Sequence, residues 1–239
     1  MNKILLAKNL AVTWHDKLLQ NDIRIIDKMN LKVANGSITA IAGLNELSLS
    51  QILKVLSGVE KPYEGEVNKS LKIGFLPSQN FIFPWLNVLQ NIKLGNENKT
   101  ADEIHKAIEF IGLKGYEDHF PKSKSYGFLF RVGFARMLLH DFDLLLLDSP
   151  FSKIQTKSKF EIYDLFLKSQ TELKKTILFS TSTIKEAVFL ADYICIIPSD
   201  TKILHEEIIS FDSKRDKSFY FSQMFIEKTN KLKLSSKIF

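Results

Sequence analysis

The sequence contains a single cysteine and has no apolar run long enough to cross a bilayer. Cys195 lies in the apolar run Tyr193–Ile197, so we expect a small core residue, and one cysteine excludes a disulfide within the chain. A spanning helix needs roughly 18 apolar residues in succession. The N-terminal residues MNKILLAKNLAV lack a small-residue cleavage site and are interpreted as a strand rather than a signal peptide. We therefore expect a cytoplasmic protein that would need a partner for any membrane role.

The sequence also lacks a strong excess of charge of one sign. Of its 239 residues 45% are hydrophobic and 25% are charged, which is typical of a soluble globular protein. The net charge of +6 comes mostly from lysine. We interpret it as a solvated surface, so no nucleic-acid partner is expected. The histidines stand singly, without metal-ligand spacing.

Buried strands alternate with helices in the second half of the chain. The alternation predicts a mostly parallel sheet, and hence an α/β fold. The expected strands are Leu144–Asp148, Ile177–Ser180 and Tyr193–Ile197, and the expected helices are Tyr126–His140, Phe160–Lys174 and Thr183–Ala191. Earlier, Thr100 and Glu103 fit the capping box of a helix at Ala101–Ile111.

The N-terminal region has the alternation of half-buried strands, which predicts an antiparallel part of the fold. Short strands are expected at Ile4–Ala7 and Ala11–Trp14, followed by Ile23–Val33. Asn35-Gly36 is a hairpin signal.

The stretch Ile38–Gly65 reads as a buried strand, a turn opened by Gly43 and a helix at about Ser50–Ser57. A strand that leads through a loop into a helix is the local architecture that binds phosphates.

Several separated stretches, taken in order, resemble the ATP-binding cassette (ABC) ATPase subunits of transporters. GLNELSLSQILKVLSGVEKPYEGEV is similar to the phosphate loop and its helix, FIFPWLNVLQNIKLG to the segment after the Q-loop, RVGFARMLLHDFDLLLLDSPFSKI to the signature helix and Walker B strand, and TSTIKEAVFLADYICII to the switch region. The FPW and EAVFLAD segments resemble most the subunits of nitrate, sulfonate and taurine importers.

The resemblance implies a P-loop NTPase-type ABC ATPase fold in a single domain, 1–239. That fold has a mostly parallel core sheet with an antiparallel β subdomain, and a helical subdomain at about 86–140. A C-terminal extension would cover about 200–239. The implied cofactors are ATP and Mg²⁺.

The phosphate-loop residues of this sequence argue against those cofactors. Such a loop needs glycines for close backbone approach, a lysine on the outer phosphates and a hydroxyl on magnesium. Gly43 and Ser50 match, but Glu46 and Ser48 stand at glycine positions and Leu49 at the lysine position. A hydrogen bond to a charged group contributes ~1.5–3 kcal/mol, so the missing lysine alone predicts triphosphate binding weakened about 10-fold or more.

The same loop has a structural interpretation that needs no phosphate. Ser48 and Gln51 fit a capping box with Ser48 as the N-cap. Glu46 would lie near the positive end of the helix dipole, where an anion is favourable. As a hypothesis, its carboxylate occupies the anion-binding position itself.

The resemblance assigns further nucleotide positions, and most are substituted. Asp148 matches the magnesium-orienting carboxylate, although an aspartate after a strand can simply cap the next turn. Ser149 stands where the catalytic glutamate belongs, and a serine hydroxyl cannot act as a base near neutral pH. Ser182 replaces the switch histidine and Ser78 the Q-loop glutamine, with Gln79 one residue late.

The signature motif reads Lys-Ser-Tyr-Gly-Phe at 124–128. Ser125 and Gly127 match the family and would face the partner's site, whereas Tyr126 replaces a glycine and would crowd the phosphate of the opposite subunit. Gln155 replaces the D-loop aspartate. Trp14 stands at the adenine-stacking position, where a plain core or rim aromatic is an equal alternative.

Three functions compete on these residues. The chain is an ATP-hydrolysing importer subunit, or a catalytically impaired partner that pairs with an active ABC subunit or a permease, or a binding or structural protein outside transport. We favour the second, at the inner face of the cell membrane, as a homodimer or heterodimer. The expected permease contacts are Phe81, Phe83, Pro84 and Trp85.

Overall fold

The computed structural model describes residues 3–16, 21–79, 81–122, 124–198, 205–209 and 215–236. Its strands are β1 (Lys3–Asp16), β2 (Asn21–Ala34), β3 (Ile38–Ala42), β4 (Glu64–Val67), β5 (Ile73–Leu76), β6 (Leu144–Leu147), β7 (Ile177–Ser180), β8 (Tyr193–Ile196) and β9 (His205–Ile208). Its helices are α1 (Glu46–Leu56), α2 (Val88–Lys93), α3 (Ala101–Phe110), α4 (Tyr126–Leu138), α5 (Thr156–Leu173), α6 (Ile184–Leu190), α7 (Lys217–Tyr220) and α8 (Gln223–Ser236).

The strands form two sheets. One is antiparallel, in the order β2-β1-β4, and the other has the order β5-β6-β7-β3-β8-β9. In the larger sheet β5, β6, β7, β3 and β8 run parallel, and β9 is antiparallel to β8 at the edge. The predicted fold class, a mostly parallel core sheet with an antiparallel part, is confirmed.

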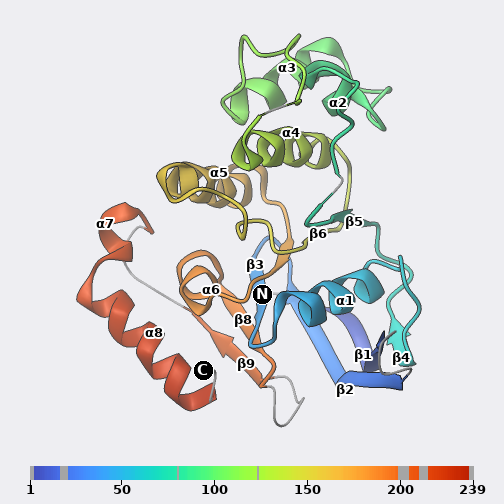
Figure 1. Ribbon diagram of the computed structural model, residues 1–239, viewed down its shortest axis with the longest axis vertical. Helices are drawn as coiled ribbons and strands as arrows, with labels where there is room; N and C mark the ends of the chain where they lie inside the picture. Colours follow the sequence, from blue (N-terminus) through green and yellow to red (C-terminus); the bar gives the residue numbers. More distant parts are fainter. Residues whose placement is uncertain are drawn as a thin grey trace.

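The five parallel strands of the larger sheet have apolar side chains in two different cores, one on each face. Leu144 and Leu146 of β6 pack with α1 and the antiparallel strands, and Leu145 and Leu147 pack with α4, α5, α6 and α8. Figure 1 shows these layers on either side of β3. Burial on both faces explains the continuous apolar runs that predicted these strands. Cys195 is 1% exposed, which confirms its prediction as a core residue.

The N-terminal strands differ from their prediction in two respects. The two short strands are one strand, β1, whose register with β2 shifts on either side of Asn9. Asn9 has a φ of 49°, a left-handed conformation that asparagine tolerates at a bulge. The predicted hairpin at Asn35-Gly36 is wrong: this turn joins β2 to β3, which belong to different sheets.

Helices α2, α3 and α4 lie together beyond the β5–β6 edge of the sheet (Figure 1). The predicted capping box is confirmed, because the Thr100 side chain accepts from the Glu103 N–H and the Glu103 carboxylate accepts from the Thr100 N–H. A division at about 86–140 stays a prediction. No described helix has the length and apolar character of a membrane span.

Gly43 directly follows β3, at a point where no side chain fits. Its φ is +106°, and a Cβ there would lie 2.5 Å from the carbonyl oxygen of Ile197. The chain therefore leaves the sheet through a turn that only glycine allows.

We predict that Gly43→Ala lowers the free energy of unfolding by about 3 kcal/mol or more, because it adds a backbone clash to an unfavourable φ. Gly58→Ala is the matched control, since Gly58 has a φ of +80° and no atom within 4 Å of its added Cβ. The control should lose only about 1 kcal/mol in urea denaturation. Equal losses would contradict the close approach to Ile197.

Candidate functional site

Helix α1 begins at Glu46, several residues before its predicted start. The N-cap is Asn45, whose side-chain oxygen accepts a hydrogen bond from the Ser48 N–H at 2.9 Å. The predicted capping box is therefore wrong. Ser48 lies inside the first turn, and the Gln51 side chain donates to the carboxylate of Glu60.

Because α1 starts early, the segment 46–48 is part of the helix, whereas in a phosphate-binding arrangement it would be a loop. Its residues are helical, and the N–H groups of Ser48 and Leu49 both donate to Asn45. N–H groups engaged in this way are not free to bind phosphate oxygens. Glu46 lies exposed in the first turn, where the helix dipole favours a carboxylate. Because none of the described N–H groups donates to that carboxylate, the hypothesis that it fills an anion nest is not supported.

Leu49, at the expected lysine position, is fully buried. It packs in the core between α1 and the sheet together with Ile52, Leu53 and Leu56. Leu47, two residues earlier, is 73% exposed. The side chain at position 49, where a lysine would reach a nucleotide, therefore points into the core.

A chain of hydroxyls surrounds Asp148 at the carboxyl end of β6. Asp148 is 2% exposed, and its two carboxylate oxygens accept from the hydroxyls of Ser50, at 2.7 Å, and Ser180, at 3.2 Å. The Ser149 N–H donates to the Ser180 hydroxyl at 2.9 Å. The structure thus brings together three predicted site residues, Ser50, Asp148 and Ser149. It adds Ser180, which sequence reasoning missed.

Ser149 lies at a constrained position in this cluster. Its φ is 44°, in the left-handed region, and it is 4% exposed. Its hydroxyl lies 3.5 Å from that of Ser180. These neutral groups can position the turn after β6, but they offer no base to activate a water molecule. Within the described residues no group of three or more histidine, cysteine, aspartate and glutamate side chains is placed to hold a metal ion.

The signature residues lie at the start of α4. Ser125 is its N-cap and accepts from the Phe128 N–H, and Gly127 is buried near Ile154. Tyr126, predicted to crowd an opposite subunit, instead points into its own chain. Its hydroxyl donates to the carbonyl oxygen of Ser78 at 3.1 Å. Burial raises the pKa of Tyr126, and the nearby carboxylates of Asp148 and Glu46 raise it further.

The remaining predicted nucleotide positions are at the surface. Ser182 is exposed between β7 and α6, Gln79 is exposed, and Ser78 is half-buried. Gln155 is the N-cap of α5 but makes no side-chain cap hydrogen bond. Trp14 is 42% exposed on β1, so it is not a core residue, and its adenine-stacking role stays a prediction.

A buried carboxylate next to Ser182 was not predicted. Glu186 is 3% exposed and accepts from the hydroxyls of Tyr163, at 2.9 Å, and Thr181, at 2.6 Å. The Lys159 amine lies 2.7 Å from the same carboxylate. The sequence signal was a glutamate directly before the apolar run Ala187–Leu190 of α6. This network fixes the turn that carries Ser182.

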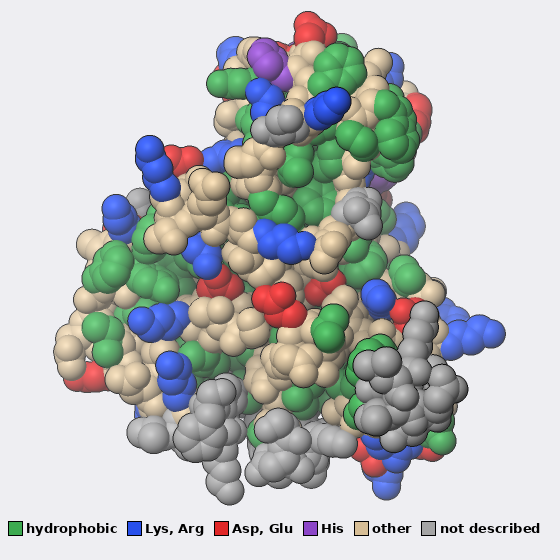
Figure 2. Space-filling view, in the orientation of Figure 1, with side chains coloured by type: hydrophobic (Ala, Val, Ile, Leu, Met, Phe, Trp, Pro, Cys, Tyr) green, Lys and Arg blue, Asp and Glu red, His purple; other side chains and the backbone are tan. Residues whose placement is uncertain are grey.

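The expected permease contacts divide into buried and exposed residues. Phe81 is 7% exposed and packs against Tyr126, so its prediction as a surface contact does not fit the structure. Trp85 is 69% exposed and Pro84 is also exposed, and the Phe83 ring lies edge-on to Trp85. Figure 2 shows apolar side chains gathered on this helical part of the molecule.

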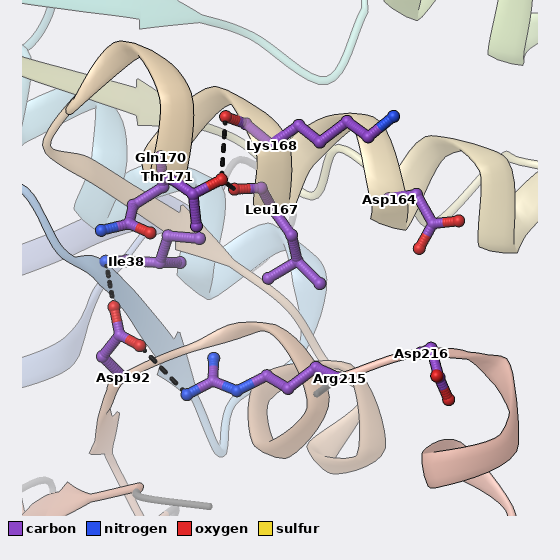
Figure 3. Close-up of a pocket in the computed structure, with 9 residues that line it drawn as sticks. All are labelled: Ile38, Asp164, Leu167, Lys168, Gln170, Thr171, Asp192, Arg215 and Asp216. Carbon is purple, nitrogen blue, oxygen red and sulfur yellow. Dashed lines mark hydrogen bonds and ion pairs between the residues drawn. The ribbon is translucent and has the colours of Figure 1, made fainter. Parts of the chain in front are cut away.

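A cavity of about 460 Å³ lies elsewhere, between α5 and the segment before α7 (Figure 3). It borders Ile38, the first residue of β3, whereas open α/β sheets bind ligands at the carboxyl ends of their strands. Arg215 crosses it and pairs with Asp192 at 3.0 Å, and the other oxygen of Asp192 accepts from the Ile38 N–H. These contacts fasten α7 to the sheet.

Comparison with known proteins gives matches to proteins of the ABC transporter family. A model of the ABC transporter family matches residues 26–152. The aliphatic sulfonates import ATP-binding protein SsuB of Bacillus licheniformis is 30% identical over 195 residues, covering 77% of this chain and 76% of the relative. Its counterpart in Bacillus cereus is 28% identical over 197 residues, covering 78% of each.

Solved structures agree on the fold. The dimeric bacterial ABC transporter cassette MJ0796 superposes with a TM-score of 0.71 at 24% identity, covering 87% of this chain and all of that one. The same cassette bound to ADP and Pi also gives 0.71, at 22% identity.

We predict that Leu49→Lys lowers the free energy of unfolding by about 3 kcal/mol or more, because it removes a buried apolar side chain and places an amine in the core. Leu47→Lys, at an exposed position two residues away, should change it by less than about 0.5 kcal/mol. Urea denaturation of both variants measures the difference. If the two are equally stable, Leu49 faces solvent, as a phosphate-binding lysine would.

Proposed function

The chain belongs to the ABC transporter family, in the sulfonate and nitrate importer branch of its ATP-binding subunits, and from this we propose that it is a catalytically impaired subunit of a membrane import system. It would dock on an integral-membrane permease, pair with an active ABC subunit, or do both. This proposal places the protein peripherally at the inner face of the cell membrane.

One observation carries the proposed impairment: α1 starts at Glu46, so the segment that should wrap phosphates is a helical turn capped by Asn45. Leu49, at the lysine position, points into the core. We infer that the described residues do not fit a bound nucleoside triphosphate with Mg²⁺. Ser50 and Asp148, the two residues that match magnesium positions, are hydrogen-bonded to each other.

A second substituted position, Ser149, supports the proposed loss of ATP hydrolysis. The residue after Asp148 is Ser149, which lies 4% exposed with its N–H engaged by Ser180. It carries no carboxylate to position an attacking water. Lost phosphate binding and a lost base act on different steps, so restoring either alone should not restore hydrolysis.

The surface features support a role in assembly. Trp85 and Pro84 form an exposed apolar turn, and tryptophan is enriched at protein interfaces. Ser125 and Gly127 keep the signature residue types at the start of α4. In a heterodimer they would complete the nucleotide site of an active partner.

An active ATPase subunit remains the alternative, favoured by the family and by the cofactor of its relatives. Titration of the purified chain with a fluorescent ATP analogue and Mg²⁺, followed by a phosphate-release assay, separates the two. We predict no saturation in the micromolar range and no turnover above a buffer blank. Micromolar affinity with turnover would overturn the proposed impairment.

If the apolar turn docks on a permease, removal of its exposed tryptophan should weaken that binding. Trp85→Ala should reduce co-purification with the permease by about 10-fold or more, as removal of an exposed aromatic anchor does at interfaces. Phe221→Ala is the matched control, because Phe221 is a 64% exposed aromatic in the C-terminal part of the chain. If neither variant reduces co-purification with the permease, or if no permease co-purifies, a role outside transport is favoured.

A further inference from the structure

The apolar turn with Phe83, Pro84 and Trp85, called the docking turn below, is held rigidly to α2. Asn91 of α2 is fully buried, and its side chain accepts from the Phe83 N–H at 2.9 Å. The same amide group donates to the carbonyl oxygens of Phe83, Leu86 and Asn87, at 3.0, 2.9 and 3.0 Å. One buried side chain therefore replaces the backbone hydrogen bonds that a loop of this kind lacks.

Phe81, which precedes the docking turn, is held by α4. The Phe81 ring lies against Gly133, where an added Cβ would be 2.6 Å from that ring. Arg136 donates to the Phe81 carbonyl oxygen, and the Phe81 ring meets Tyr126 edge-on at 5.9 Å. Tyr126, Gly133 and Arg136 are spaced so that they share one face of α4.

We propose that Tyr126 is a latch: its hydroxyl, bonded to the Ser78 carbonyl oxygen, holds the docking turn in one orientation without any nucleotide. Ser78 lies 48 residues earlier in the chain, immediately after β5. The bond therefore ties the start of α4 to the carboxyl end of the sheet. This inference rests on the proposed docking function and adds its regulation: partner binding would not respond to nucleotide.

The surroundings of the Tyr126 hydroxyl keep it protonated, so that it can donate a hydrogen bond. Tyr126 is half-buried, and burial together with the carboxylates of Asp148 and Glu46 disfavours the phenolate. The Lys153 amine lies 5.8 Å from the centre of the Tyr126 ring. The ring thus contacts both the Phe81 ring and a cation, and each contact favours its observed orientation. A glycine at this position could make none of these contacts.

Hydrogen exchange on the purified full chain tests the latch without a permease. The probes are the N–H groups of Phe83 and Leu86, which donate within the docking turn to Asn91 and to the Phe83 carbonyl. In Tyr126→Phe we expect both to exchange roughly 5-fold faster, since an ordinary hydrogen bond contributes about 1 kcal/mol. Tyr126→Gly should accelerate them at least as much.

Tyr116→Phe is the matched control, a 43% exposed tyrosine of the same helical part, and should leave both rates unchanged. The chain has two tryptophans, so a Trp14→Phe background makes Trp85 the only indole reporter. In that background Tyr126→Phe should lower the fluorescence anisotropy of Trp85.

Two results would overturn the latch. One is unchanged exchange at Phe83 and Leu86 in both Tyr126 variants. The other is a wild-type protein in which millimolar Mg-ATP itself accelerates these amides, since the orientation would then depend on nucleotide. Faster exchange in the variants, with no effect of Mg-ATP on the wild type, supports it. Failure of Trp85→Ala to weaken permease capture would instead reject the docking function and leave the latch result standing.

Discussion

The buried carboxylate of Asp148 is the interaction on which the carboxyl edge of the sheet depends. It is 2% exposed and would be costly without partners, and it obtains them from Ser50 of α1 and Ser180 of β7. Two hydroxyls thereby join three elements that are far apart in sequence. The Ser149 N–H then bonds to Ser180. The edge where open α/β sheets bind ligands is in this chain cross-linked by its own side chains.

Much of the fold could be predicted because burial on two faces leaves an unmistakable pattern. The four consecutive leucines of β6 must alternate between two cores, and they do. Turn chemistry was less informative. Asn35-Gly36 does form a turn, but a turn does not reveal which sheet the following strand joins. The bulge at Asn9 escaped notice for a related reason, because a left-handed asparagine continues β1 where the polar residues suggested a break.

The candidate site was predicted in its residue types and less well in its geometry. Asn45 and Ser48 are both good N-cap residues, and the spacing of Ser48 and Gln51 favoured the wrong one. The direction of Tyr126 depends on a contact with Ser78 across 48 residues, for which local sequence holds no signal. Asn91 and Glu186 are polar side chains on the buried faces of α2 and α6. Such placement is itself a sign of a buried hydrogen-bonding role.

The position of β3 in the sheet has a consequence for biosynthesis. This strand is complete by Ala42, yet its neighbours are β7 and β8, with Ile38 opposite Ile177 and Ala42 opposite Ile196. A nascent chain therefore carries an apolar central strand until translation reaches Ile177, because neither neighbour exists before then. At roughly 5–20 residues per second the wait lasts on the order of ten seconds, during which the strand is open to aggregation or to chaperones. Closure of the sheet, and of the turn at Gly43 against Ile197, therefore waits until translation has passed Ile197.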